Sequence, residues 1–231
     1  MPTAIITGAS RGLGLALARA LAERGWNLVL DARGADALQE VAQELAGTTE
    51  VVAVAGDVAD EGHRSELVEA ARAMGGPDLL VNNASLLGPS PQPKLADYSV
   101  DDFRSVYEVN VIAPLALIQQ ALPLLSQSPQ GRIINVTSDA GVEGYEGWGG
   151  YGSSKAALEH LSKVLAAEHP ALKVWWVDPG DMNTQMQQEA FPDEDVSDRP
   201  PPEKSVPGFL KLIDEDPPSG RYQARPASDE S

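Results

Sequence analysis

Residues 147 to 161 read GWGGYGSSKAALEHL and place one tyrosine, Tyr151, four residues before one lysine, Lys155. Side chains four residues apart lie on the same face of a helix, so we expect these two groups to be close together. A free tyrosine has a pKa of about 10, and a nearby ammonium group lowers it by favouring the phenolate. The pair could therefore transfer a proton near neutral pH; the alternative is a half-exposed tyrosine beside a solvated lysine.

A glycine-rich stretch, TGASRGLG, follows the first predicted strand and contains Gly8, Gly12 and Gly14. At a strand-to-helix turn, backbone without Cβ atoms can approach a pyrophosphate, and the helix N-terminus supplies free N–H donors. The spacing differs from G-x-G-x-x-G, and close packing of helix on sheet is the alternative explanation. In this context the stretch predicts a dinucleotide site.

Two further polar residues, Ser138 in INVTSDAG and Asn110 in VYEVNVIAP, stand near predicted strand or helix boundaries. Taken alone, each is explained as well by a hydrogen bond to nearby backbone, which serine and asparagine commonly make. Their assignment to a site depends on the rest of the chain.

These residues must be positioned by strands that alternate with helices. Strand-like runs are TAIIT, NLVLDA, EVVAVAGD, DLLVNNAS, GRIINVTS and LKVWWVDPG, and helical patterns separate them, including a long one from about Val100 to Ser126. Continuous apolar strands between helices predict a parallel sheet covered on both faces, a doubly wound α/β fold. With 231 residues, we expect a single domain spanning 1–231, with ligands at the carboxyl ends of the strands.

Composition narrows the function classes. The formal net charge of −17 disfavours nucleic acid and anionic membranes as partners. No cysteine is present and the three histidines lack metal-ligand spacing, so we expect neither a disulfide framework nor a metal site. The stretch VIAPLALIQQALPLL is interrupted by two glutamines and is too short to span a bilayer. With a strand-like run from Thr3 and no leader pattern before it, the sequence indicates a soluble cytoplasmic protein.

Six motifs occur in the order found in classical short-chain dehydrogenases/reductases: TGASRGLG, DLLVNNAS, VYEVNVIAP, INVTSDAG, YGSSK and DPGDMNT. The chain resembles that family from residue 3 to about residue 184. The resemblance implies a Rossmann-type fold and NAD(P)-dependent oxidation and reduction of a small carbonyl or alcohol substrate.

The resemblance also implies roles for four residues. Tyr151 would be the general acid of carbonyl reduction, with Lys155 lowering its pKa and binding the nicotinamide ribose. Asn110 would link the lysine to solvent through water, and Ser138 would hold the substrate carbonyl. The alternative is a catalytically silent nucleotide-sensing or interaction protein on the same fold.

Cofactor contacts follow from the same motifs. The expected cofactor-binding residues are Gly8, Ser10, Arg11, Gly12, Leu13, Gly14, Arg33, Asp57, Val58, Asn83, Ala84, Tyr151, Lys155, Pro179, Gly180, Met182 and Thr184. Ser85 replaces the glycine usual after NNA, a small departure that concerns local backbone geometry.

Cofactor preference depends on the end of the second strand. In the family an acidic residue there bonds the ribose 2′-hydroxyl of NAD(H). Alignment by strand end places Asp31 one residue before that position, neutral Ala32 in it, and Arg33 where NADP-preferring members carry arginine. With Arg11 as a second basic residue, we expect NADP(H) rather than NAD(H).

The remaining segments concern substrate and assembly. Tyr145 and Trp148 fall where the family lines its substrate pocket, and the acidic, proline-rich segment 185–205 falls at its substrate lid; packing and a solvated loop are the alternatives. After Gly220 the usual final strand is not recognisable, which argues against the commonest tetramer contact, and 225–231 are expected to be a flexible tail. Apolar residues on more than one face of VIAPLALIQQALPLL favour a homodimer, with a tetramer as the alternative.

Overall fold

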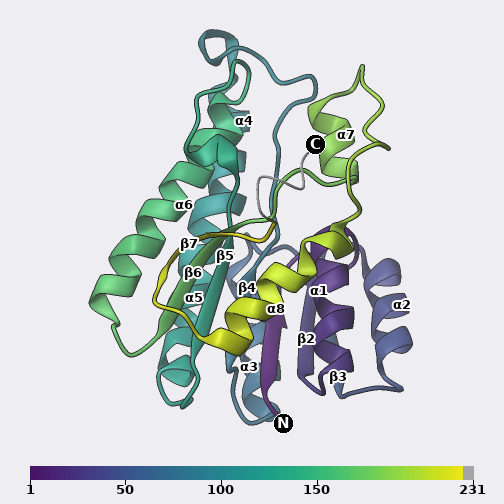
Figure 1. Cartoon of the computed structure of the whole chain (residues 1–231), viewed down its shortest axis with the longest axis vertical. Helices are drawn as coiled ribbons and strands as arrows, with labels where there is room; N and C mark the ends of the chain where they lie inside the picture. The colour runs from purple at the N-terminus through teal and green to yellow at the C-terminus, as the bar shows by residue number, and fades with distance from the viewer. Residues whose placement is uncertain (226–231) are drawn as a thin grey trace.

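A seven-stranded parallel sheet forms the centre of the computed structural model, which describes residues 1–225 (Figure 1). The strands are β1 (Thr3–Ile6), β2 (Asn27–Ala32), β3 (Val51–Ala55), β4 (Leu79–Asn82), β5 (Arg132–Val136), β6 (Lys173–Asp178) and β7 (Gly220–Gln223). Their spatial order is β3-β2-β1-β4-β5-β6-β7. The order reverses between β1 and β4, and in such sheets ligands bind at the carboxyl ends of the strands near that point.

Helices cover both faces of the sheet (Figure 1). They are α1 (Gly12–Glu23), α2 (Ala35–Leu45), α3 (Glu61–Ala73), α4 (Val100–Tyr107), α5 (Ala113–Leu125), α6 (Gly149–Glu168), α7 (Gln185–Ala190) and α8 (Val206–Glu215). Residues of α1, α2 and α8 share one apolar cluster with the sheet, and residues of α3 and α5 share the other. The expected doubly wound fold is confirmed, because β1, β2 and β4 are buried along their whole length.

Helix α5 belongs to a helical run longer than the apolar stretch suggested. A π-helical segment, Glu108–Ile112, joins α4 to α5, so the run Val100–Leu125 has 26 residues and by length and composition alone would be able to cross a membrane. The apolar stretch is therefore part of a longer helical run than the sequence analysis expected. The inward side chains Leu117, Ala121 and Leu125 pack in the core, as expected of a core helix in this fold.

The C-terminal part is more regular than the sequence suggested. A final strand is present after all, since β7 pairs with β6 in parallel and Trp175 is in register with Gly220. Helix α8, which the sequence analysis did not predict, buries Phe209 against the first apolar cluster. Arg225, the first residue of the expected tail, is buried and hydrogen-bonded, and 226–231 lie outside the described residues.

Candidate active site

The glycine-rich stretch forms a tight turn between β1 and α1. Gly8 and Gly12 have φ values of +67° and +56°, which residues with a Cβ rarely adopt. A Cβ on Gly14 would lie 2.2 Å from the carbonyl oxygen of Gly8, so the backbone of α1 passes directly over the turn. Gly8 and Gly12 thus permit a backbone conformation that other residues rarely adopt, and Gly14 permits a close approach that a side chain would block.

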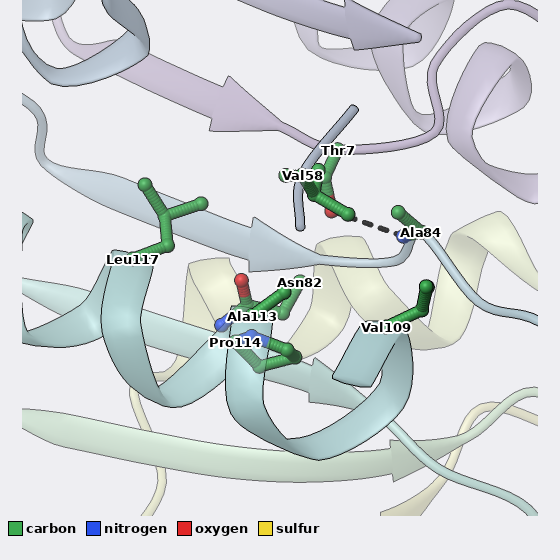
Figure 2. A pocket seen from close by; sticks show the side chains of 8 residues that line it. All are labelled: Thr7, Val58, Asn82, Ala84, Val109, Ala113, Pro114 and Leu117. Carbon is green, nitrogen blue, oxygen red and sulfur yellow. Dashed lines mark hydrogen bonds between the residues drawn. The ribbon is translucent and has the colours of Figure 1, made fainter. Parts of the chain in front are cut away.

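Side chains from the end of β4 hold this turn in place. The Asn83 side-chain amide donates to the carbonyl oxygens of Thr7 at 2.9 Å and Gly8 at 3.1 Å. In return, the Thr7 hydroxyl oxygen accepts from the backbone N–H of Ala84 at 3.0 Å, the bond drawn in Figure 2. The same view shows Val58 beside Thr7 and Ala84, so two of the expected cofactor-binding residues, Val58 and Ala84, lie close together although they come from different parts of the chain.

The geometry fits the diphosphate of a dinucleotide. Helix α1 begins at Gly12, no acidic residue stands in its first turn, and Arg11 makes no side-chain cap to it. Backbone N–H groups of such a first turn, together with the positive end of the helix dipole, favour a bound anion. Gly8, Ser10, Arg11, Gly12 and Leu13 are therefore the residues that would hold the diphosphate.

Asp31, at the end of β2, is buried and bonded within the protein. Its Oδ1 lies 2.6 Å from His63 Nε2, and its Oδ2 accepts from the backbone N–H of Gly8 at 3.2 Å. Burial raises the pKa of Asp31, and the hydrogen bond with His63 opposes that rise. Arg33 and Arg11, in contrast, have exposed side chains, and Arg11 donates to the side chain of Gln185.

Asn110 lies in the π-helical segment and is 1% exposed. Its Oδ1 accepts from the Leu86 backbone N–H at 2.8 Å and from the Ser85 hydroxyl at 3.1 Å. Its Nδ2 donates to the Leu86 carbonyl and to Ser154 Oγ, both at 2.9 Å. Ser85, the departure from the family pattern, therefore contributes a hydroxyl to this network, a role that the sequence did not reveal.

Tyr151 and Lys155 occupy one face of α6, as their spacing predicted, and both are buried. Lys155 Nζ lies 5.4 Å from the centre of the Tyr151 ring and donates to the Val136 carbonyl at 2.9 Å. The expected fall in the tyrosine pKa is not found. Burial raises the pKa of Tyr151, a hydrogen bond with Ser85 opposes the rise, and burial lowers the pKa of Lys155 to about 8.

A cleft opens beside Tyr151. Ser138 lies in it, and its hydroxyl donates to Asp139 Oδ1 at 2.9 Å while its oxygen accepts from the backbone N–H of Ala140 at 3.2 Å. The local backbone bond expected of an isolated serine is thus present, yet the residue also faces the cleft with Tyr151. A carbonyl compound in the cleft would lie beside both residues.

The loop after β6 and the start of the predicted lid complete the cleft. Pro179, Gly180, Met182 and Thr184 line it, followed by Met186, Gln187 and Ala190 of α7. Trp148 also lines the cleft, with its ring centre 5.8 Å from that of Phe191, and the Tyr145 ring lies 6.5 Å from that of Trp148. Segment 185–205 therefore contributes a wall of the cleft, which is the position that the lid hypothesis requires.

Sequence reasoning missed Arg221 of β7. Its guanidinium donates to Glu159, to Asp178 and to the carbonyl oxygen of Ser138. The only signal was a lone arginine in a segment where no strand was expected. No motif marked it.

Comparison with known proteins shows which sequences the chain is similar to. A family model described as short chain dehydrogenase matches residues 2–195. A benzil reductase ((S)-benzoin forming) of Saccharomyces cerevisiae is 36% identical over 193 residues, covering 80% of this chain and 73% of the relative. An oxidoreductase of Staphylococcus epidermidis is 33% identical over 186 residues, covering 79% of each chain.

Solved structures give the same result. A short chain dehydrogenase from Pseudomonas syringae has a TM-score of 0.91 and 34% identity, with 97% of this chain and 94% of that chain covered. A short chain dehydrogenase from Shigella flexneri, solved in complex with NADP, has a TM-score of 0.89 and 29% identity, with 97% of each chain covered.

Burial of Lys155 predicts a specific pH dependence of stability. Its pKa falls from 10.5 in the unfolded chain to about 8 in the folded chain, so the unfolded chain binds more protons between these values. The free energy of unfolding should therefore rise with pH between these two values. Below the folded-state pKa the lysine is charged in both states, and the destabilisation caused by burying its charge is then fully present. Lys155→Met should remove the rise and increase stability near neutral pH by about 1 to 3 kcal/mol.

Urea unfolding at several pH values across the window, for wild type and Lys155→Met, measures this effect. Lys163→Met serves as the control, because Lys163 is exposed on the same helix. The same pH slope in wild type and Lys155→Met would contradict the prediction.

Proposed function

The chain belongs to the short chain dehydrogenase family and is an oxidoreductase; we propose that it reduces a ketone or related carbonyl compound to an alcohol with NADPH. The observation that carries the proposal is the cleft that the buried Tyr151 and Ser138 line together. When bound, the cofactor supplies the hydride. The residues of the chain bind and orient the carbonyl and supply the proton.

Tyr151 is the proposed proton donor. Burial raises its pKa, so in the chain without ligand the phenol stays protonated near neutral pH, the form that a general acid needs. As electron density builds on the substrate oxygen, proton transfer becomes favourable, and Ser138 holds that oxygen by hydrogen bonding. A positive charge on Lys155 would stabilise the phenolate that remains, and Asn110 keeps helix α6 in register through Ser154.

The environment of Asp31 supports a preference for NADPH. Both carboxylate oxygens already have partners, His63 and the Gly8 N–H, and the side chain is only 2% exposed, so a ribose 2′-hydroxyl has little access to it. Arg33 and Arg11 are exposed and available to a 2′-phosphate, which guanidinium groups bind through charge-assisted hydrogen bonds. The NADP complex of the Shigella flexneri relative is consistent with this preference.

The walls of the cleft favour an apolar, aromatic substrate. Trp148, Leu87, Met182 and Met186 line it, and aromatic and thioether side chains pack well against flat rings. The similarity to a benzil reductase, whose name describes an aromatic diketone as substrate, points to the same class. Aromatic ketones and vicinal diketones are therefore the substrates to test first.

The alternative, a catalytically silent nucleotide-binding protein, makes a different prediction. It would bind NADPH without oxidising it in the presence of ketones, diketones or quinones. Decay of the reduced nicotinamide absorbance with such a panel separates the two, and the presence of Asn110, Ser138, Tyr151 and Lys155 favours turnover. A cytoplasmic location, without nucleic-acid or membrane partners, remains the prediction from the net charge of −17.

Tyr151→Phe tests the proton donor. The variant keeps the ring and its packing, so fold and NADPH affinity should stay near wild type while kcat falls by roughly 10²- to 10⁴-fold. Tyr107→Phe is the control, since Tyr107 stacks on Phe103 rather than facing the cleft. Near wild-type kcat in Tyr151→Phe, on a substrate reduced well by wild type, would remove Tyr151 from this role.

Arg33→Ala tests cofactor selectivity. Loss of one charge-assisted bond to the 2′-phosphate should lower the ratio of kcat/KM for NADPH over NADH by about tenfold or more. Arg72→Ala, which removes an exposed arginine from α3, should leave the ratio unchanged. Equal use of both cofactors by wild type, or an unchanged preference in Arg33→Ala, would show that Arg33 does not read the phosphate.

A homodimer is the proposed assembly, through the outer faces of α5 and α6. Ile112, Leu115 and Val164 are exposed apolar residues on this side of the molecule. Covering them removes apolar surface from water, which is the main favourable term in association. Light scattering at micromolar concentration should give twice the chain mass, and Leu115→Glu should shift the mass toward the monomer; a monomeric wild type would contradict the proposal.

A further inference from the structure

Arg221 lies between two buried carboxylates at the carboxyl edge of the sheet. Its Nε donates to Glu159 Oε1 at 3.0 Å, and one terminal nitrogen donates to Asp178 Oδ2 at 3.0 Å. The same nitrogen donates to the carbonyl oxygen of Ser138 at 3.3 Å. Glu159 and Asp178 are 4% and 5% exposed, so the guanidinium is the cation that balances buried charge here.

Each carboxylate also holds a part of the candidate active site. Glu159 Oε1 accepts from the Thr137 hydroxyl at 2.9 Å, immediately before Ser138. Asp178 Oδ1 accepts from the Gly180 N–H at 3.0 Å, which closes the turn at the start of the Pro179–Thr184 loop. One guanidinium therefore connects the segment that carries the substrate-facing serine with the loop that forms the opposite wall of the cleft.

A second arginine of the same C-terminal segment acts on that loop. Arg225 is buried, and it donates through Nε to the Pro179 carbonyl at 3.2 Å and through a terminal nitrogen to the Asp181 carbonyl. Its partners are carbonyl oxygens, so removing its side chain leaves no carboxylate of this network unpaired. Loss of Arg221 would leave buried carboxylates without a cation, whereas loss of Arg225 would leave only carbonyl oxygens without a donor.

We propose that Arg221 is a positioning residue for carbonyl reduction, which fixes Ser138 and the Pro179–Thr184 loop relative to Tyr151, with Arg225 as a second support of the loop. The inference rests on the proposed function and adds residues that act through others without touching substrate. Arginine suits this role because its planar fork can bind two carboxylates and a carbonyl oxygen in fixed directions, whereas lysine is a single flexible point charge. Misplacement of a reacting group by about 1 Å can cost about 100-fold in rate.

The proposal is tested with three variants, Arg221→Met, Arg221→Lys and Arg225→Met. A buried arginine elsewhere in the fold, Arg132, serves as the control. Arg132 is 6% exposed, pairs with Asp216 at 3.1 Å, and stands at the start of β5, the end of that strand far from Ser138. Arg132→Met therefore reports the general effect of removing a buried arginine. The measurements are kcat and KM on the best diketone, Kd for NADPH by fluorescence, melting temperature, and hydrogen–deuterium exchange of residues 138–142 and 179–184.

Arg221→Met should lower kcat/KM by about 10- to 100-fold, mainly through kcat, and speed exchange in both segments. Arg221→Lys should recover part of the charge effect and little of the rate. Arg225→Met should weaken NADPH binding and speed exchange in 179–184 only. Arg132→Met should lower the melting temperature while kcat/KM stays within about twofold of wild type.

A rate loss in Arg132→Met equal to that in Arg221→Met, or unchanged exchange at 138–142 in Arg221→Met, would overturn the proposal. If Arg221→Met does not fold, Arg221→Met with Glu159→Gln leaves one unpaired carboxylate, Asp178, instead of two, and the same criteria apply. If wild type reduces no carbonyl compound, the proposed function fails, while exchange and NADPH affinity still decide whether Arg221 positions these segments.

Discussion

The arrangement of the site depends on the hydrogen bonds made by the side-chain amide of Asn110. Its oxygen accepts two hydrogen bonds and its nitrogen donates two, so the whole capacity of the group is used inside the protein. These bonds join the segment after β4, the long helical run and helix α6. A buried amide with every partner in place specifies one geometry, because any slip leaves a polar group unpaired. The π-helical segment is what allows Asn110 to point into this junction.

The same edge of the sheet holds buried carboxylates, each with a hydrogen-bonded side-chain partner. Asp31 with His63 lies beneath the glycine-rich turn, and Glu159 with Asp178 and Arg221 lies beside the cleft. Replacing buried ion pairs by apolar residues is often neutral or stabilising, so such pairs contribute little evidence for stability. Their contacts with Gly8 and Ser138 suggest instead that they fix backbone beside the two candidate binding regions.

Much of the fold could be predicted because apolar runs and turn residues are local signals. The strand NLVLDA matches β2 at both ends, and the helical region predicted from about Val100 to Ser126 matches the run Val100–Leu125. The C-terminal elements were missed because β7 is a short strand of mixed polarity and α8 follows a proline-rich segment. The available signal was the helical spacing of Val206, Phe209, Leu212 and Ile213, all of which are buried.

The site was predicted only in part, because local spacing can be read from a sequence and contacts between distant residues cannot. Spacing placed Tyr151 and Lys155 on one face, but it could not show what surrounds them, and burial reversed the expected direction of the tyrosine pKa. The register at the end of β2 was read from the strand boundary, whereas the partners of Asp31 come from the turn after β1 and from α3, which only the tertiary structure brings together. Arg221 was missed because an ion pair between residues 62 positions apart leaves no periodic pattern.

The position of these arginines along the chain also has a consequence for biosynthesis. Translation produces the glycine-rich turn, Asn110 and Tyr151 well before Arg221 and Arg225, and β7 can pair with β6 only after α8 has been made. Because a domain generally folds as a unit, the serine segment and the loop after β6 cannot be secured until the last part of the chain has been synthesised. A chain that stops before β7 would lack both of these supports although it already contains every residue of the glycine-rich turn.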